Sequence, residues 1–577
     1  MRLPVSWLRE YAPVPEPYDA LEIGRRLTQA GLEVEAVEQV GQDVHGVITA
    51  QVITVEELSG FKKPIRYCRV AVSDAELSAD PETLTGVVCG AVNFAPGDRV
   101  AFAEVGATLP GGFEITAAKK YGRVSAGMIC AVDELGIGED HSGILILPPD
   151  TPLGVDFAAY AGLRDDVLDI TVTPDRGYAV SVRGVARELA GAYRVPYTDP
   201  ALTIAGDEDA PGIASAGAGP AAGQAPWPAE IADPTACDRF VLREVRGFDP
   251  RARTPLWMQV RLARCGMRSV SLAVDVTNYL MLELGQPLHA FDRSKLSGTV
   301  VVRRARPGET LTTLDHVDRV LDPADIVITD DRGPISLAGT MGGLATEIDG
   351  DSTDLVIEGA HFSDTGTAKM ARRHRLHSEA SYRFERGTDP ELPPRATARA
   401  AALLARLGGA TVVPGATQAA VPHPPRTIEI AASYPDRVAG VVYGLDTVVA
   451  RLQEVGCEVR SVPASAPVTV APWRAGPARP AAEPGPPGRD DLVLLVTPPS
   501  WRPDLTDPAD LAEEVIRLEG YGNVPVRQPR ATAGQGLTER QRSLRAIART
   551  LGAAGFVEVH CDPFAPAGEA DSLMLTP

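Results

Sequence analysis

One glutamate and one histidine stand out because they lie in apolar surroundings where a polar side chain needs a reason. Glu358 is in the apolar run LVIEGAHF, and His289 is in the run GQPLHAFD. A glutamate is almost never fully buried unless it has a partner. Glu358 therefore either pairs structurally, with an arginine of residues 371–386 as the candidate, or lines a cavity. A buried histidine is more often a core residue with its hydrogen bonds made within the protein than a functional residue. His289 by itself therefore does not indicate a functional site.

A second group of residues is acidic and lies in WRPDLTDPADLAEEVIRL, residues 501–518. Asp507 can cap a helix that has Pro508 at its first position. Residues three and four apart share a helix face, so four carboxylates could converge on one hard cation such as Mg²⁺. The helix macrodipole also favours acids at a helix N-terminus, and the spacing alone favours this plainer interpretation. The four carboxylates are Asp504, Asp510, Glu513 and Glu514.

A third group is basic and interleaved with aromatic residues. Four of the six lysines fall in two segments, GFKKPIRYCRV and AAKKYGRVSAGMIC. Cations can follow a phosphate backbone while aromatic rings stack on bases, so this pattern is typical of proteins that bind looped or single-stranded RNA. A solvated charged face is the alternative, and the concentration of lysines makes the two interpretations about equal. The candidate RNA-binding residues are Lys62, Lys63, Arg66, Lys119, Lys120 and Arg123.

The bulk composition bounds the class of protein. A chain of 577 residues predicts roughly three to five domains, and 44 % hydrophobic with 23 % charged residues is typical of globular proteins. The net charge of −20 argues against a simple nucleic-acid coat protein. Seven scattered cysteines without a CxxC pair indicate unlinked thiols in a reducing compartment. Since no signal peptide or run of about 20 apolar residues occurs, we expect a cytoplasmic protein without a membrane segment.

Local patterns predict the elements that must position these side chains. In residues 1–40 we expect a helix with an apolar side, followed by a strand. Residues 41–155 alternate in short strands broken by glycine, which favours a small closed β structure of the OB type. Residues 165–195 predict a strand, a turn and a helix, and another helix is expected at 538–554. The apolar positions of the first helix are Leu21, Gly24, Leu27 and Ala30.

Two segments of low complexity interrupt this pattern. Residues 205–228 predict a flexible linker. Residues 461–490 are rich in Pro, Ala and Gly and predict a disordered insertion, because they cannot bury enough apolar surface to offset their ordering entropy.

Six longer motifs carry a family resemblance, in the same order along the chain. In combination they closely resemble the β subunits of bacterial phenylalanyl-tRNA synthetases. The resemblance runs from Met1 to about residue 560, and the two lysine segments resemble a tRNA-binding module of synthetases. The motifs are VTPDRGYAVSVRGVARELA, SLAVDVTNYLMLELGQPLHAFD, ISLAGTMGG, LVIEGAHF, ARRHRLHSEASYRFERG and SWRPDLTDPADLAEEVIRLEGYGNVP.

The resemblance implies a multidomain α+β architecture with an OB-fold tRNA-binding barrel, a large mixed editing domain of the B3/B4 type and a small B5 domain like a winged helix. We expect an N-terminal α/β segment at 1–40, the barrel at 41–155, the remainder of the N-terminal domain at 156–204, the linker at 205–228, the editing domain at 229–420, the B5 domain at 421–527 and the start of a class II synthetase-like domain at 535–577. Most of that last domain and a C-terminal ferredoxin-like domain are missing, so the chain is expected to be C-terminally truncated.

The resemblance also implies an activity. The family joins phenylalanine, ATP and tRNA to give phenylalanyl-tRNA, AMP and diphosphate, with activation on a separate α subunit. This fits the absence of a GxxxxGK[ST] loop or dinucleotide fingerprint here. The β subunit binds tRNA(Phe), hydrolyses mischarged tyrosyl-tRNA and scaffolds an (αβ)₂ heterotetramer. Alternatives are a stand-alone tRNA-binding protein and a trans-editing hydrolase without ligase activity.

Specific side-chain roles follow from the resemblance alone. A pocket shaped for phenylalanine cannot strongly reject tyrosine, which only adds a hydroxyl. Glu358 would hold a carboxylate where the phenol points and gain a charge-assisted hydrogen bond from it. The surrounding editing residues would be His289, Thr277, Asn278, Gly339 and Ala380. The acids at 504, 510, 513 and 514 would bind Mg²⁺, and ATP would bind the α subunit.

Overall fold

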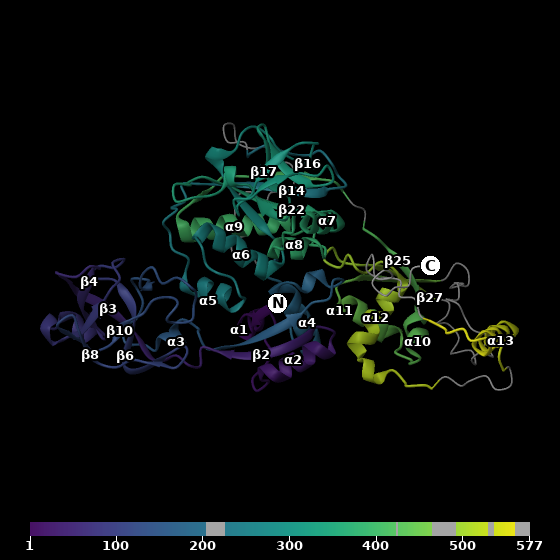
Figure 1. The fold of residues 1–577 in the computed structure, drawn as a ribbon, viewed down its shortest axis with the longest axis horizontal. Helices are drawn as coiled ribbons and strands as arrows, with labels where there is room; N and C mark the ends of the chain where they lie inside the picture. Colours follow the sequence, from purple (N-terminus) through teal and green to yellow (C-terminus); the bar gives the residue numbers. More distant parts are fainter. Residues whose placement is uncertain (203–225, 423–424, 464–491, 529–535, 560–577) are drawn as a thin grey trace. The chain divides into compact units, whose positions relative to one another are not determined.

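The computed structural model describes residues 1–202, 226–422, 425–463, 492–528 and 536–559. The chain forms two compact units, Met1–Val524 and Pro525–Pro577, and Figure 1 shows the elements of each. The predicted linker at 205–228 lies outside the described residues up to position 225, and so does most of the predicted insertion. The first three insertion residues, 461–463, belong instead to a strand, since they pair in register with β27.

The N-terminal region is a three-stranded antiparallel sheet covered by helices. Its sheet order is β1 (Arg2–Pro4), β12 (Asp165–Thr171) and β2 (Glu33–Val40), so the chain leaves after β2 and returns at β12. The helices are α1 (Val5–Tyr11), α2 (Ala20–Gln29) and α4 (Val182–Tyr193). The predicted apolar side of α2 is partly wrong, because Leu21 is 69 % exposed while Ile23 and Leu27 are buried. Asp19 caps this helix and starts it one residue earlier than the apolar pattern implies.

Between β2 and β12 the chain forms the predicted β-rich module. The sheet order is β10-β6-β3-β4-β5, all antiparallel, with β7 and β11 also on β6. The Ala126 N–H donates to the carbonyl of Gly86 in β5, two residues before β10 begins, so the two edges of the sheet approach each other. The elements are β3 (His45–Leu58), β4 (Ile65–Ala71), β5 (Thr85–Cys89), β6 (Arg99–Leu109), β7 (Phe113–Glu114), β8 (Ala118–Lys120), β9 (Arg123–Ser125), β10 (Met128–Ile129), β11 (Ile146–Leu147) and α3 (Phe157–Tyr160).

The central region consists of two sheets that share an apolar core. The first sheet has the order β15 (Leu288–Asp292), β22 (Leu355–Phe362), β14 (Cys237–Arg246) and β23 (Thr411–Val412), with β24 (Thr417–Ala420) also on β14. The second has the order β13 (Ala229–Ile231), β16 (Val300–Arg304), β19 (Ile326–Asp330), β20 (Gly333–Leu337) and β21 (Met341–Gly342).

Helices flank both sheets of the central region. The helices are α5 (Leu256–Arg264), α6 (Leu272–Leu284), α7 (Asp364–His374), α8 (Glu379–Phe384) and α9 (Pro393–Gly408). Helix α9 packs on β14 and β22 and against α6, and Figure 1 draws α6 and α9 on the same side of that sheet. Side chains on this side of β22, including Leu355 and Ile357, share one core with the N-terminal region. Side chains on its opposite side, including Val356 and Ala360, face the second sheet.

A small α/β region ends the first unit. Its antiparallel sheet has the order β25 (Ile428–Ala431), β27 (Leu492–Thr497) and β26 (Glu458–Pro463), accompanied by α10 (Tyr434–Ala439), α11 (Leu445–Glu454) and α12 (Pro508–Glu519). The second unit contains α13 (Glu539–Ala553), which confirms the helix predicted there and is capped by Thr538.

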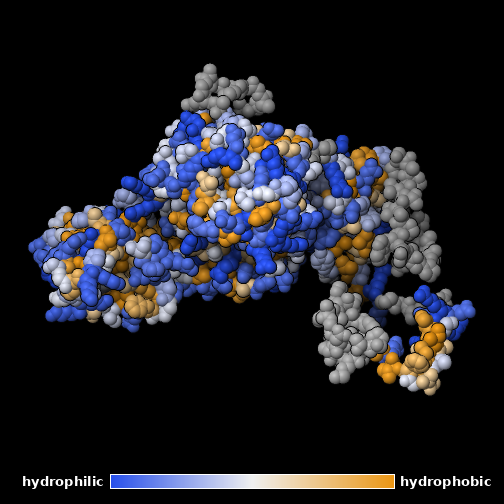
Figure 2. All heavy atoms as spheres, turned by 45° about the horizontal axis from the view of Figure 1, so that its top comes forward, coloured by the Kyte–Doolittle hydropathy of each residue, from blue (hydrophilic) through white to orange (hydrophobic). Residues whose placement is uncertain are grey.

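Surface hydropathy, helix length and the state of the cysteines bear on membrane contact and on disulfide bonding. On the face drawn in Figure 2, hydrophobic residues lie scattered among hydrophilic ones. None of the helices in the described ranges combines the length and the apolar character that a bilayer crossing requires. The six cysteines in the described ranges are unlinked, and five of them are buried, as predicted. Cys561 lies outside those ranges.

Candidate functional site

Glu358 lies in the middle of β22 and faces the second sheet. Successive side chains of a strand point to opposite faces, so Glu358 shares its face with Val356 and Ala360 of the inter-sheet core. His289 lies directly opposite Glu358 on β15, in an antiparallel register that runs without a bulge from Leu288 to Asp292. Directly paired residues share a face, so strand pairing places the two polar side chains next to each other.

Two glycines, Gly342 in β21 and Gly339 in the turn before it, pack closely against side chains of the inter-sheet core. A Cβ atom at Gly342 would lie 2.7 Å from His289 Cε1 and 3.0 Å from its Nε2. Gly339 has a φ of +66° and stands where a Cβ would lie 2.7 Å from the Phe384 ring and 2.9 Å from the Phe362 ring. Since real Cβ atoms do not approach that closely, the two glycines are needed for this close packing. Ala380 of α8 packs against the same core.

Burial without a partner dominates the electrostatics of this pair. Glu358 is 6 % exposed, and among the described residues no hydrogen bond or ion pair to its side chain is found. Burial alone raises the pKa of Glu358 to about 8. Burial likewise lowers the pKa of His289 to about 4, and its Nε2 has no hydrogen-bond partner in the described part of the chain. Both groups are therefore uncharged near neutral pH.

The arginine alternative for Glu358 is wrong in this structure, because the arginines of 371–386 that form ion pairs do so elsewhere. Arg373 pairs with Asp325, Arg383 donates to Glu379 at 2.8 Å, and Arg386 donates to Glu385 at 2.5 Å. The other alternative, a carboxyl that lines a cavity, stays a prediction; Glu358 faces the interior between the two sheets without a partner among the described residues.

The two α6 residues predicted for the site have a less direct place in it. Thr277 is buried, and its hydroxyl donates to the carbonyl of Val274 at 2.7 Å within the helix. Asn278 is half-buried on the same helix. Helix α6 leads through Gly285 into β15, and no hydrogen bond links either side chain to Glu358 or His289 in the described ranges. Their role stays a prediction.

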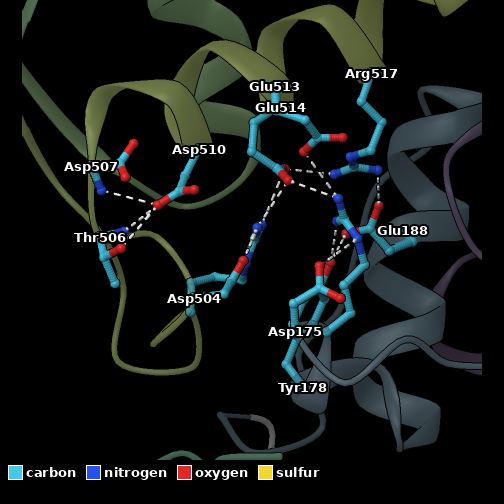
Figure 3. A network of polar contacts seen from close by, with 12 residues as sticks. Asp175, Tyr178, Glu188, Asp504, Thr506, Asp507, Asp510, Glu513, Glu514 and Arg517 are labelled. Carbon is cyan, nitrogen blue, oxygen red and sulfur yellow. Dashed lines mark hydrogen bonds and ion pairs between the residues drawn. The ribbon is translucent and has the colours of Figure 1, made fainter. Parts of the chain in front are cut away.

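The predicted acidic group lies around the start of α12 and is built differently (Figure 3). Glu514 is buried and faces three guanidinium groups. Arg502 donates to both of its oxygens at 2.9 and 3.1 Å, and Arg517 donates to it at 2.7 Å. Arg176, from the turn before α4, approaches to 3.2 Å. Burial acts to raise the pKa of Glu514, but the charges of Arg517 and Arg502 outweigh it and hold that pKa well below its usual range.

The other three carboxylates have separate partners. Asp504 accepts from Arg502 at 2.7 Å. Glu513 pairs with Arg176 at 3.1 Å and accepts from the Tyr521 hydroxyl. Asp510 turns back to accept the backbone N–H groups of Thr506 at 2.7 Å and Asp507 at 2.9 Å (Figure 3). Asp507 caps the helix as predicted, with Pro508 at its first position.

These contacts test whether the acidic group fits a magnesium ion. Within the described ranges, no three Asp, Glu, His or Cys side chains are arranged to hold a metal. Arginine nitrogens occupy the oxygens of Glu514, and backbone amides occupy Asp510, so in this arrangement the four carboxylates do not converge and do not fit Mg²⁺. The magnesium site stays a prediction, and no step below depends on it.

The two basic loops of the β-rich module meet through their aromatic residues. The rings of Phe61 and Tyr121 pack edge to face with centroids 4.7 Å apart. This contact joins the β3–β4 loop, which carries Lys62 and Lys63, to the β8–β9 hairpin, whose strand β8 carries Lys119 and Lys120. All four lysines of the two segments are exposed, and none forms an ion pair among the described residues. One surface thus combines unpaired cations with two exposed rings.

The two arginines of the same prediction are used differently. Arg66 donates to Glu57 at 3.0 Å and to the carbonyl of Phe94 at 2.9 Å. Arg123 donates to both oxygens of Glu56 at 2.7 and 2.8 Å. Both therefore brace the module itself, which leaves the lysines as the free cations of this surface.

Sequence reasoning missed several residues that shape these sites. Arg176, Arg502 and Arg517 bind the acidic group, although all three lie within motifs that were recognised. The pairing of an acidic helix with arginines from a distant turn has no signal in the spacing of the acids. Gly342 was also missed, and the GG pair in ISLAGTMGG could have indicated a close backbone approach.

Three protein-family models match the chain. Residues 236–409 match "B3/4 domain", residues 487–521 match "tRNA synthetase B5 domain", and residues 47–156 match "Putative tRNA binding domain". A relative from Thermobifida fusca, named phenylalanine–tRNA ligase beta subunit, is 52 % identical over 577 residues. A relative of the same name from Streptomyces avermitilis is 53 % identical over 569 residues.

The chain is thus similar to two phenylalanine–tRNA ligase beta subunits over less than two thirds of their own length. The match to the first relative includes 100 % of this chain and 64 % of that relative's length. The match to the second includes 98 % of this chain and 63 % of that relative's length. A solved N-terminal fragment of the phenylalanyl-tRNA synthetase beta subunit from Pyrococcus horikoshii is 13 % identical with a TM-score of 0.28, covering 62 % of this chain and 88 % of that one. That likeness is too low to support an argument.

The three domain matches confirm the main lines of the predicted architecture. The tRNA-binding, B3/4 and B5 domains are all present, and Glu358 and His289 fall inside the B3/4 match. The acidic group of α12 falls inside the B5 match, and both lysine loops fall inside the tRNA-binding match. The class II synthetase-like domain expected from residue 535 onward stays a prediction, as do the exact domain boundaries.

Proposed function

We propose that this chain works as the β subunit of a phenylalanine–tRNA ligase, binding tRNA and hydrolysing tRNA mischarged with tyrosine. The observation that carries the proposal is the Glu358–His289 pair in the B3/4 domain. Glu358 is buried between two sheets and the half-buried His289 on the neighbouring strand has a buried Nε2, and both groups lack a partner in the described part of the chain. Burying polar groups without hydrogen bonds is costly, and such costs are retained where a ligand completes the bonding.

The selectivity problem of the ligase explains why such a pair is useful. Tyrosine differs from phenylalanine by one hydroxyl, and an apolar pocket rejects an added hydroxyl poorly. A second site with polar groups placed for that hydroxyl discriminates strongly, because the analogue without it leaves those groups unpaired. In the hydrolysis, a water oxygen bonds to the acyl carbon, the ester C–O bond breaks and a proton passes to the ribose oxygen. Tyrosine and free tRNA result.

The remaining parts of the proposal concern partners and cofactors. An α subunit would carry amino-acid activation with ATP and Mg²⁺, and two αβ pairs would form the heterotetramer in the cytoplasm. The relatives' name, beta subunit, supports a partner subunit. The unpaired lysines of the β-rich module support an RNA ligand, because Lys and aromatic side chains together fit phosphates and bases.

The test measures deacylation of tyrosyl-tRNA and phenylalanyl-tRNA by the full chain, with and without an α subunit. Glu358→Ala should slow tyrosyl-tRNA hydrolysis by about 10- to 150-fold if a strong hydrogen bond to the hydroxyl is lost. Glu347→Ala, at an exposed glutamate of the same domain, is the matched control. A Glu358→Ala protein that melts normally and clears tyrosyl-tRNA at the wild-type rate would contradict the proposal.

Co-purification separates the proposed function from its alternatives. An α subunit recovered in stoichiometric amount supports the ligase. Recovery of the chain alone, with tyrosyl-tRNA hydrolysis intact, supports a trans-editing hydrolase. Recovery alone with tRNA binding but no hydrolysis supports a stand-alone tRNA-binding protein, for which the lysine surface would suffice.

A further inference from the structure

The β-rich module contains a cavity of about 400 Å³, which shares only Lys120 with the residues discussed above. Residues of β5, β7, β8 and β10 and the loop at 141–144 line it. Pockets of ~300–1,000 Å³ with an apolar lining and a few polar groups are typical of small-ligand sites. The buried part of this lining includes Cys89, Ile115, Ile129 and Ile144.

An aromatic ring, a cation and a carboxyl group line the same cavity. Phe113 of β7 is 60 % exposed, although its side chain is large and apolar. Lys120, the last residue of β8, is exposed and forms no ion pair within the described ranges. Glu134 is half-buried, and one of its oxygens accepts the Ala131 N–H at 2.7 Å. Its other oxygen makes no hydrogen bond with the part of the chain that the structure describes, so the cavity offers an acceptor.

These three groups fit the parts of one nucleotide. Proteins that bind single-stranded RNA stack an unpaired base on an aromatic ring, bind its edge by hydrogen bonds and place cations on the phosphates. A carboxylate accepts hydrogen bonds from the amino group of a base, as Glu and Asp do from N4 of cytosine. A free phosphate fits this cavity less well, because Glu114 and Glu134 place two carboxyl groups around it.

The cavity adjoins the exposed lysines of the module. Lys120 lines the cavity, and the next residue, Tyr121, packs against Phe61. Phe61 directly precedes Lys62 and Lys63 in the β3–β4 loop. An RNA strand that follows these lysines therefore reaches the cavity at Lys120.

We propose that this cavity holds one unstacked base of the tRNA, and that Glu134 selects a base with an exocyclic amino group. Phe113 stacks on the base, Lys120 binds a neighbouring phosphate, and Glu134 accepts a hydrogen bond from the amino group. Adenine, cytosine and guanine carry such a group, whereas uracil has only carbonyl oxygens in its place. This inference rests on the proposed function, because it specifies the RNA binding proposed for the module.

Single-stranded cytidine and uridine hexamers test the selection of the base, because cytosine has an amino group at position 4 and uracil has a carbonyl. Fluorescence anisotropy measures their binding to the full chain at pH 8, where Glu134 is ionised although burial raises its pKa. The wild type should bind the cytidine hexamer more tightly by about 10-fold or more. Equal affinity for the two hexamers would overturn the proposal.

Two glutamine variants assign the preference to one side chain. Glu134→Gln should reduce the preference to within about 2-fold, since glutamine offers both a donor and an acceptor. Glu139→Gln is the matched control, at an exposed glutamate of the same segment that does not line this cavity. A preference that Glu134→Gln leaves unchanged would show that another group selects the base, which also overturns the proposal.

Filling the cavity tests whether the base enters it. Gly90 lines the cavity, its φ lies outside the left-handed region, and a Cβ atom there would meet no atom within 4 Å. Gly90→Phe should therefore melt like the wild type and lower the affinity for the cytidine hexamer by about 10-fold or more. Gly350→Phe is the control, since a Cβ atom at that glycine also meets no atom. Unchanged hexamer binding by Gly90→Phe would overturn the proposal, and loss of α-subunit recovery alone would assign the cavity to a protein contact instead.

Removing the ring tests the stacking. Phe113→Ala should weaken the binding of both hexamers by about 5-fold or more. Val105→Ala, at an exposed apolar residue of β6 outside the cavity lining, is the control. Equal affinities of these two variants would overturn the assignment of Phe113. Unlabelled tRNA should displace the cytidine hexamer from the wild type, and a failure to do so would exclude tRNA as the occupant.

The hexamers separate this proposal from the proposed function, because they carry no aminoacyl ester. If the hexamer results fail while Glu358→Ala loses tyrosyl-tRNA hydrolysis, the base cavity is wrong and the proposed function stands. If the cytidine preference is found while Glu358→Ala hydrolyses tyrosyl-tRNA at the wild-type rate, the hydrolytic part of the proposed function is wrong and the base cavity stands.

Discussion

Glu358 and Glu514 are both buried glutamates, yet their surroundings have opposite effects. Glu358 lies between two sheets with no partner among the described residues, and burial raises its pKa to about 8. Glu514 lies between α12 and the turn before α4, and three arginines hold its pKa well below the usual range. One site keeps a proton and the other keeps a charge, although the amino acid and the degree of burial are nearly the same.

We interpret this difference as the one between the proposed ligand site at Glu358 and a structural site at Glu514. Every oxygen of Glu514 is used by the protein, and Arg517 continues the network to Glu188, 2.6 Å away on α4. Figure 3 shows these side chains converging from α12 and the N-terminal region. The carboxyl group of Glu358 makes no hydrogen bond or ion pair with the described residues. A buried charge whose hydrogen bonds are all made within the protein holds the surrounding side chains in one arrangement. A buried polar group without such bonds can still bond a ligand.

The largest expected effect is on stability. Glu514→Ala leaves three buried arginines facing one another, so we expect a loss of about 3–5 kcal/mol. Glu358→Ala removes an unpaired polar group and should cost about 1 kcal/mol or less, apart from the small cavity it creates. Denaturant titration of the full chain, monitored by tryptophan fluorescence and circular dichroism, measures both. Equal losses in the two variants would remove the distinction between the sites.

Closing the space beside His289 should have the next largest effect. Gly342→Ala places a methyl group 2.7 Å from His289 Cε1, so the ring must move. Displacing a positioned group by about 1 Å can cost up to about 100-fold in rate, and we expect tyrosyl-tRNA deacylation to fall by about 10- to 100-fold. Gly350→Ala is the matched control, since a Cβ there meets no atom within 4 Å. Similar rates for the two variants would place His289 outside the site.

Stability should also depend on pH with opposite signs at the two glutamates. The folded pKa of Glu358 is raised from 4.5 to about 8, so its contribution is full below pH 4.5 and is lost as the pH rises through about 8. The slope is at most about 1.4 kcal/mol per pH unit. The pKa of Glu514 is lowered, so its contribution is present above pH 4.5 and is lost only as the pH falls.

Melting temperatures across this pH range check both signs. The wild-type protein should lose stability relative to Glu358→Gln as the pH rises from about 5 to 9, because the variant has no proton to lose. A constant difference between the two proteins over that range would mean that Glu358 does not titrate there. Glu514→Gln should differ from wild type least at the acidic end.

The smallest effect concerns the charges of the β-rich module. Lys62, Lys63, Lys119 and Lys120 form no ion pair within the described ranges, whereas Arg66 and Arg123 are paired with glutamates. Changing the four lysines to Ala should flatten the salt dependence of tRNA binding by roughly 0.7–0.9 log units of slope per lost phosphate contact. The double change of Arg66 and Arg123 to Ala should alter it less. Equal slopes for wild type and the lysine variant would refute the lysine interface.

The sequence predicted the secondary-structure elements and the types of domain better than the side chains with which individual residues pair. Glu358 was recognisable because a glutamate in LVIEGAHF needs a reason, and the helix cap at Asp507 followed from local chemistry. The apolar face of α2 was misjudged at Leu21, because the buried face consists of Ala20, Ile23, Gly24 and Leu27. The partner Arg176 of Glu514 was unpredictable, since it lies more than 300 residues away and only the tertiary fold brings it there.

The protonation of Glu358 can be measured directly by infrared difference spectroscopy of the wild-type protein against Glu358→Gln. At about pH 7 we predict a C=O stretching band of a protonated carboxyl in the wild type that is absent from the variant. That band should disappear above about pH 8–9, while the corresponding comparison for Glu514 should show only carboxylate bands throughout. A Glu358 difference spectrum with only carboxylate bands at pH 7 would contradict the account.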